Sequence, residues 1–294
     1  MIGDIPTVTF DTSAHNRLVK DGPLSEAILA GLKSGYHFRF AGLSLEEMVS
    51  TPDTSQRLAL FTYCGRLQDG STDAIHPHYE TLKLLILAHS QNPATFDWKT
   101  VNVRAVDFER EIGRRQFVWD DELSAEQRAR QIQDQKDFRQ LYTRLQPKLA
   151  KIIFDHGEAL PVTLQEVITR LRASDNKLML GTGKMLYDRA AGTDVSEATI
   201  MDFINVCPPF RALLYGTLIS WYDLSIRDRH AGEKFQAGRN DMFMSVYLPY
   251  CDQFITAEEK GEQEKCLREI INLAELETQV LSYDDFCDSF LVTV

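Results

Sequence analysis

The chain has 294 residues, of which 44% are hydrophobic and 26% are charged, a composition typical of globular proteins. Its 43 acidic residues outnumber the 32 basic ones, and the net charge of −11 argues against a protein that coats nucleic acid with a broad basic surface. The five cysteines are scattered without a CxxC pair, which argues against a disulfide framework and against a structural zinc site.

The N-terminal part of the chain alternates between predicted strands and helices. TVTF at 7–10 has the β-branched and aromatic residues of a strand. Residues 23–35 have apolar side chains at helical spacing and end at a glycine, and aromatic residues alternate with polar ones in a second predicted strand over 36–44. SLEEMVS then begins another predicted helix, and the helical pattern continues over 54–68.

The middle of the chain is predicted to be almost wholly helical, and the end returns to alternating strands and helices. A long charged helix is predicted at 120–149, and apparent linkers lie at 67–73 and 230–241. A short helix at 241–251, a strand at 252–256, a helix at 257–276 and a last strand at 278–282 follow. Because strands joined through helices run parallel, we predict an α/β fold. Its doubly wound parallel sheet would comprise residues 1–72 and 238–294, interrupted by an all-helical insertion at 73–237.

Four carboxylates are predicted to meet at one edge of this sheet, since ligands of such sheets bind beyond the carboxyl ends of the strands. Asp11 ends the first strand, and Glu47 lies on the first turn of the helix after the second strand. Asp241 opens the helix before strand 252–256, and Glu258 follows that strand. Four such acids would repel one another without a cation between them, and Mg²⁺ or Mn²⁺ prefers oxygen ligands. A metal held in this way suits phosphodiester hydrolysis.

The order of these motifs resembles a PIN domain, the small metal-dependent ribonuclease fold. The resemblance covers roughly residues 5–70 and 238–288 and is carried by four segments: FDTSAHNRL (10–18), LSLEEM (43–48), CDQFITAEE (251–259) and VLSYDDF (280–286). It implies a PIN-like α/β/α sheet in which Asp11, Glu47, Asp241 and Glu258 bind metal and act in catalysis. Ser13, Thr256 and Glu259 would support them; Glu258 stands where the family more often has aspartate.

We therefore expect an endoribonuclease that cleaves single-stranded RNA with a water activated by Mg²⁺ or Mn²⁺. Arg229 and Arg239 are candidate phosphate contacts, and the helical insertion would select substrate or bind a protein partner or inhibitor. A degenerate PIN-like module that binds RNA or protein without cleaving it is one alternative. A DNA-directed nuclease is another, although the acidic balance does not favour it. MIGDIPTVTF lacks the features of a secretory signal, and the longest apolar run, 212–222, is shorter than the roughly 20 residues of a membrane span, so we expect a cytoplasmic protein.

Each candidate also has a structural interpretation. Asp11 could cap the helix that begins near Ser13, and Glu47 could form a capping box with Ser44, which would leave Glu46 as the site residue. Asp241, Glu258 and Glu259 are also acids of the kind favoured in the first turn of a helix. Asp252 is at the wrong end of its strand for this site. LGTGKM (180–185) lacks the strand and spacing of a phosphate loop, and His76-Pro77-His78 is better explained as a solvated turn than as a metal site.

Overall fold

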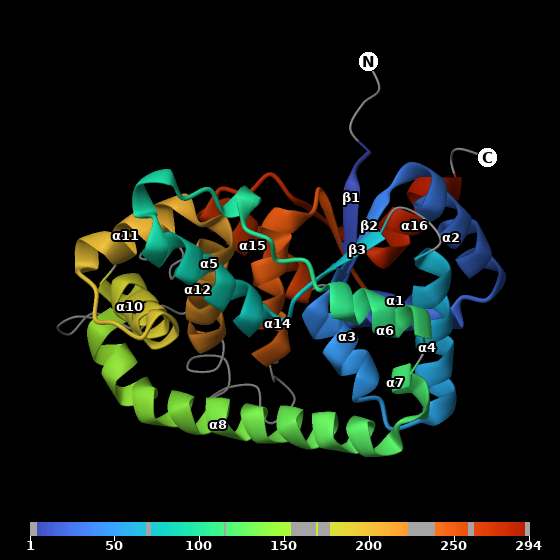
Figure 1. Cartoon of the computed structure of the whole chain (residues 1–294), viewed down its shortest axis with the longest axis horizontal. Helices are drawn as coiled ribbons and strands as arrows, with labels where there is room; N and C mark the ends of the chain where they lie inside the picture. Colours follow the sequence, from blue (N-terminus) through green and yellow to red (C-terminus); the bar gives the residue numbers. More distant parts are fainter. Residues whose placement is uncertain are drawn as a thin grey trace.

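The computed structural model describes residues 5–68, 72–114, 116–153, 169, 177–222, 239–257 and 262–291. A five-stranded sheet with the order β3-β2-β1-β4-β5 lies in one half of the molecule (Figure 1). Its strands are β1 (Thr7–Phe10), β2 (His37–Ala41), β3 (Thr72–Ile75), β4 (Gln253–Thr256) and β5 (Gln279–Ser282). Every pair of neighbouring strands is parallel, which confirms the predicted α/β class with a parallel sheet.

One face of the sheet packs against helices from both ends of the chain. The helices of this layer are α1 (Thr12–Lys20), α2 (Pro23–Gly35), α4 (Thr54–Leu67), α6 (Val106–Arg114), α7 (Gln116–Trp119) and α16 (Tyr283–Leu291). Phe10, Phe38 and Phe40 form the centre of this core, with ring centroids 5.2 Å apart for the first pair and 4.8 Å for the second. Alternate strand residues thus fill one side of the sheet, as period-2 alternation predicts.

The other face of the sheet is covered by a second layer, so the sheet lies between helices. This layer comprises α12 (Pro208–Tyr222), α14 (Arg239–Met244), η5 (Ser245–Tyr250) and α15 (Glu262–Ala274). Phe254 of β4 and Val280 of β5 are buried against it. The sheet therefore has a hydrophobic core on each of its two faces.

A helical part extends from α12 away from the sheet (Figure 1). It contains α5 (His78–Gln91), η1 (Pro93–Thr95), η2 (Trp98–Thr100), α10 (Lys177–Ala191) and α11 (Glu197–Val206). Phe203 and Phe210 are fully buried in its core. The long helix α8 (Asp121–Ile153) runs along one side of the molecule, from α7 beside the sheet towards α10 (Figure 1). Among the helices that the structure describes, none is long and apolar enough to cross a membrane.

The structure differs from the sequence-based prediction most clearly at residues 67–73, where a linker was expected. The segment from Thr72 to Ile75 is instead the edge strand β3, which pairs with β2 from Phe38 to Ala41. In addition, Ile112 of α6 and Val118 of α7 are buried in the same core as the sheet. These parts of the expected helical insertion therefore belong to the α/β core. The other expected linker, 230–241, lies mostly outside the described residues.

A close approach between two chain segments determines where α3 (Gly42–Val49) begins. A Cβ atom at Gly42 would lie 2.5 Å from the Pro77 nitrogen and 2.6 Å from the Ile75 oxygen, so only glycine fits there. The helix therefore begins directly after β2, in contact with the chain that leaves β3. This arrangement sets the position of Glu47 relative to the sheet.

Candidate functional site at the carboxyl edge of the sheet

The strand order reverses between β1 and β4, whose carboxyl ends lie side by side. From β1 the chain continues outwards to β2 and β3, whereas β4 lies on the other side of β1 and leads to β5. In open parallel sheets, ligands bind at the place where the strand order reverses in this way. Asp11 directly follows β1, and its backbone N–H donates to the Ile255 carbonyl of β4 over 3.0 Å. Asp11 therefore lies at this reversal point.

The Asp11 carboxylate is buried and accepts three hydrogen bonds. Only 3% of the residue is exposed. Its Oδ1 accepts from the Ser13 hydroxyl and from the Ala14 backbone N–H, each over 2.7 Å. Its Oδ2 accepts from the Thr256 hydroxyl of β4, also over 2.7 Å. Asp11 thus caps α1, as the structural interpretation predicted, and in addition contacts a strand 245 residues away. Capping alone does not account for the second contact.

Ser13 of α1 and Thr256 of β4 form a small polar bridge beside Asp11. Their hydroxyl oxygens are 3.5 Å apart, and the Ala257 backbone N–H donates to the Ser13 hydroxyl over 2.8 Å. Both side chains therefore orient the Asp11 carboxylate from two different elements. The structure brings together these two residues and Asp11, all of which were predicted to belong to one site.

Glu47 turns towards the same edge from α3. Its carboxylate accepts a hydrogen bond from the hydroxyl of Thr12, the residue after Asp11. The predicted capping box is wrong, because α3 begins at Gly42 rather than after Ser44. The Ser44 hydroxyl is buried and donates to the Phe10 carbonyl over 3.3 Å instead. Sequence analysis did not identify Thr12 as a site residue, although it directly follows Asp11.

The helix that carries Asp241 also approaches this edge. Met244, at the end of α14, has its sulfur 4.0 Å from the Ser44 hydroxyl, and that hydroxyl contacts the last residue of β1. Asp241 is the third residue of α14 and precedes Met244 by one helical turn. The side chains of Arg239 and Asp241 lie outside what the structure describes. Residues Arg229, Glu258 and Glu259 lie outside the described residues altogether.

The buried Asp11 carboxylate has hydrogen-bond donors around it but no opposite charge among the described residues. Burial raises the pKa of Asp11, and the hydrogen bonds from Ala14, Thr256 and Ser13 only partly offset this effect. No arginine or lysine in the described ranges forms an ion pair with it. A bound cation would favour the ionised form, because a positive charge nearby lowers the pKa of a carboxyl group.

The donor set fits a hard divalent cation. The carboxylates of Asp11 and Glu47 come from different elements and supply oxygen ligands, and Mg²⁺ needs only one or two carboxylates because it keeps most of its waters. Within the part of the chain that the structure describes, no group of three His, Cys, Asp or Glu residues is positioned to hold a metal. The side chains of the other predicted acids, Asp241, Glu258 and Glu259, lie outside the described part of the chain.

An exposed aromatic residue next to the site was missed by sequence analysis. Tyr79, near the start of α5, is 57% exposed. Partial burial raises the pKa of Tyr79, and the negative charge of Glu46 raises it further. Tyr79 follows Pro77 by two residues, and Pro77 packs against Gly42 at the start of α3. No spacing rule in the sequence links this tyrosine to the strand-end acids.

The remaining predicted motifs have structural roles. LGTGKM (180–185) lies inside helix α10, so it forms no phosphate loop. His78 is not in a solvated turn as expected; it is buried and stacks on Phe243 with ring centroids 3.9 Å apart. Asp252 accepts from the Thr7 backbone N–H over 2.6 Å at the opposite edge of the sheet, which agrees with its predicted structural role. All five cysteines are free, and four of them are buried.

Comparisons of the chain with protein-family models, with curated proteins and with solved structures find no match.

Proposed function

We propose that this protein is a PIN-like, metal-dependent nuclease that hydrolyses single-stranded RNA. The observation that supports it best is that a buried carboxylate, Asp11, lies where the strand order reverses, and that the next residue, Thr12, donates to the carboxylate of Glu47. Asp11 follows β1 and Glu47 lies on α3, and each is oriented by a threonine hydroxyl. A cation beside Asp11 would offset the unfavourable burial of its charge, which raises the pKa of this carboxyl group.

The residues of the site have separate roles in this proposal. Asp11 and Glu47 would hold Mg²⁺ or Mn²⁺, with Asp241 and Glu258 completing the ligand set. The metal, when bound, would lower the pKa of a water molecule and stabilise negative charge on the phosphate. Thr256 and Ser13 keep the Asp11 carboxylate in one orientation, because each occupies a different side of it. Thr12 does the same for Glu47.

Two features favour a single-stranded substrate over a duplex. The net charge of −11 does not suit a protein that grips a long stretch of double-stranded nucleic acid. The exposed ring of Tyr79 offers a surface on which an unpaired base can stack. Arg239, if it contacts phosphate, would add a charge-assisted contact from α14.

The test compares wild-type protein with Asp11→Asn and Glu47→Gln on an unstructured RNA and on single-stranded DNA of the same sequence. Reactions contain Mn²⁺, Mg²⁺ or a chelator. Asp107→Asn is the matched control, since this acid lies on α6 with 90% of its side chain exposed. We expect the two site variants to lose at least about a hundredfold in cleavage rate, because metal ligands and their supporting groups have effects of that size. The control variant should retain the wild-type rate.

Cleavage that persists in Asp11→Asn or in the chelator would contradict the proposed metal site. Cleavage of DNA in preference to RNA would identify a DNA-directed nuclease with the same site. If wild-type protein binds RNA without cleaving it under either metal, the protein is a binding module and the catalytic proposal is wrong.

A further inference from the structure

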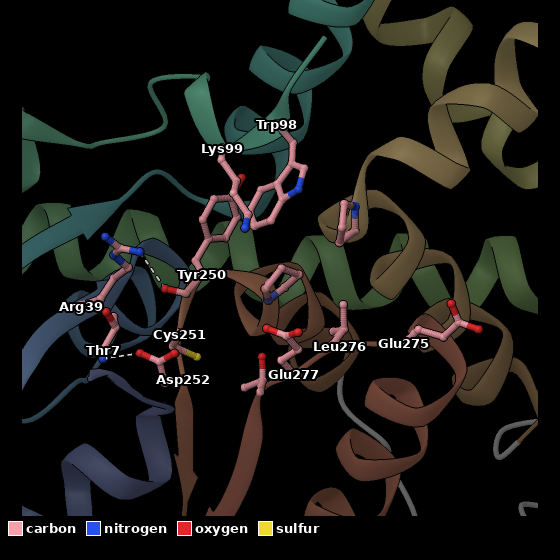
Figure 2. A pocket seen from close by; sticks show the side chains of 13 residues that line it. Thr7, Arg39, Trp98, Lys99, Tyr250, Cys251, Asp252, Glu275, Leu276 and Glu277 are labelled. Atoms are coloured by element: carbon pink, nitrogen blue, oxygen red, sulfur yellow. Dashed lines mark hydrogen bonds between the residues drawn. The ribbon is translucent and has the colours of Figure 1, made fainter. Parts of the chain in front are cut away.

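A pocket of about 530 Å³ lies at the amino-terminal edge of the sheet, opposite the Asp11 edge. Its wall is formed where three strands begin, at Thr7, Asp252 and Thr278. Figure 2 shows Trp98 of η2 on the facing side, and Pro208 at the start of α12 also lines the pocket. The volume is within the range of about 300–1,000 Å³ that small-molecule sites occupy. This pocket is therefore separate from the proposed nuclease site.

Trp98 and Tyr250 form the aromatic side of the pocket. Their ring centroids are 5.2 Å apart, with the ring planes nearly perpendicular at 78°. The ammonium group of Lys99 lies over the Trp98 ring, 5.7 Å from its centroid. The face of Trp98 thus already accepts a positive charge, since the π-electrons of indole attract cations.

The Tyr250 hydroxyl is a second feature of this side. It is buried and has no hydrogen-bond partner among the described residues. A buried hydroxyl without a partner is unfavourable, because it has given up its hydrogen bonds to water. The Trp98 and Tyr250 rings contact each other directly, so a ligand would lie against this pair and not between the two rings.

The charges of the lining favour a cation. Arg39 is already neutralised, because its Nε and Nη2 donate to the two Asp73 oxygens over 2.7 Å each and its Nη1 donates to the Tyr250 carbonyl over 2.6 Å. The remaining charged groups are the carboxylates of Asp252, Glu275 and Glu277 against the single ammonium of Lys99. Figure 2 shows the Asp252 and Glu277 carboxylates on the opposite side of the pocket from Trp98.

The start of α12 does not offer an anion site in this pocket. A helix N-terminus usually attracts anions through its free N–H groups. Here the first two helical residues are Pro208 and Pro209, which have no N–H. The next N–H groups are used locally, since Phe210 donates to Cys207 and the Arg211 N–H donates to the Cys207 carbonyl over 3.0 Å. The N-terminus of α12 therefore has no free N–H group that could donate to an anion in the pocket.

We propose that this pocket binds an organic cation, an ammonium or guanidinium group on an apolar stem, between Trp98 and the carboxylates of Asp252 and Glu277. The cation takes the place of the Lys99 ammonium on the indole ring, and the stem packs on Pro208 and Pro249. The aromatic contact contributes more to affinity than the carboxylates do, because both acids are exposed and surface ion pairs contribute little. The same chemistry is present in free polyamines and in the basic side chains of a peptide.

The test is isothermal titration calorimetry of the full chain with agmatine, with spermidine and with an acetylated glycine-serine peptide that carries one central arginine. Inorganic phosphate is the counter-probe. We expect Trp98→Leu to weaken binding about tenfold and Glu277→Gln about threefold, from the usual strengths of these contacts. Lys99→Ala should strengthen binding, because it removes the intramolecular competitor. Trp119→Leu is the matched control, since this tryptophan is 67% exposed on α7.

Binding of the free amines but not of the peptide would support the proposal and identify a small-molecule ligand. Binding of the peptide alone would support it and identify a protein side chain as the source. The proposal is wrong if the wild type binds none of the three cations, if it binds phosphate instead, or if Trp98→Leu behaves like Trp119→Leu. If Trp98→Leu fails to fold, the proposal is tested by the expected weaker binding of Glu277→Gln and the expected stronger binding of Lys99→Ala. Asp11→Asn should bind the cations normally, which separates this outcome from that of the nuclease assay.

Discussion

Replacing Asp11 with asparagine or with alanine separates the structural role of this residue from its proposed role as a metal ligand. The carboxylate caps α1 through the Ala14 N–H and joins β1 to β4 through the Thr256 hydroxyl. Asparagine can keep both contacts, because its oxygen caps helices as well as that of aspartate does and its amide can donate to the Thr256 oxygen once that hydroxyl rotates. Alanine keeps neither contact.

The contacts allow the size of each effect to be worked out. In Asp11→Ala, loss of the helix cap costs about 1 kcal/mol, and loss of an acceptor for the buried Thr256 hydroxyl costs at least about 1 kcal/mol more. We therefore expect the free energy of unfolding to fall by about 2–3 kcal/mol. In Asp11→Asn the three hydrogen bonds are retained and a buried charge is removed, so the free energy of unfolding should equal or exceed that of the wild type at neutral pH.

The pH dependence of stability gives an independent check. Because burial raises the pKa of Asp11 in the folded state, the folded protein binds this proton more tightly than the unfolded chain. The contribution of Asp11 to stability is therefore largest below its ordinary pKa of about 4 and is lost as pH rises through the folded-state value. The stability advantage of Asp11→Asn over the wild type should accordingly grow as the pH is raised from 4 towards neutrality.

The assay is thermal and urea denaturation of the wild type and both variants, with and without Mn²⁺. At ten times its dissociation constant, a bound cation should stabilise the wild type by about 1.4 kcal/mol and leave Asp11→Asn unchanged. If Asp11→Asn is destabilised as much as Asp11→Ala, the charge itself is structural and the reasoning fails. Equal stabilisation of the wild type and Asp11→Asn by Mn²⁺ would also refute it.

Three further predictions concern other parts of the fold. Arg57 is 1% exposed and donates to the Thr51 carbonyl over 2.6 Å and to the Ser124 hydroxyl over 3.0 Å. Arg57→Met should therefore lower the unfolding free energy in urea titrations by about 2–3 kcal/mol, and a loss below about 1 kcal/mol would contradict this role. Burial raises the pKa of Asp73, but hydrogen bonds from His37 and Arg39 and their charges outweigh it and leave that pKa below its ordinary value. The stability that ionised Asp73 supplies is thus present above about pH 4 and is lost in acid. Asp73→Asn should lower the unfolding free energy by about 2 kcal/mol at pH 7 and should reduce the loss of stability on acidification. An unchanged loss of stability in acid would contradict this. If unpaired bases stack on the exposed ring of Tyr79, Tyr79→Ala should weaken RNA binding about tenfold in fluorescence anisotropy, and an unaltered affinity would remove this residue from the substrate path.

Much of the fold follows from local pattern alone. TVTF at 7–10 and QFIT at 253–256 are strands because β-branched and aromatic residues alternate, and helices such as 23–35 follow from apolar spacing and a terminal glycine. Strands connected through helices must run parallel, so the sequence also predicted that Asp11 and Thr256 lie at one edge of the sheet. Their contact over 2.7 Å is the outcome of that topology.

The tertiary structure decided what local pattern does not encode. TDAI at 72–75 contains aspartate and alanine, which are depleted in strands, so its pattern does not predict one; it becomes a strand because its backbone pairs with β2 from Phe38 to Ala41. The start of α3 depends on the close approach of Gly42 to Pro77, which turned Glu47 towards Thr12 and excluded the capping box. The cation pocket likewise requires Trp98 and Glu277, which are far apart in the sequence, to face one another. Each of these features arises from contacts between distant residues, and such contacts depend on how the elements pack rather than on the period of any one segment.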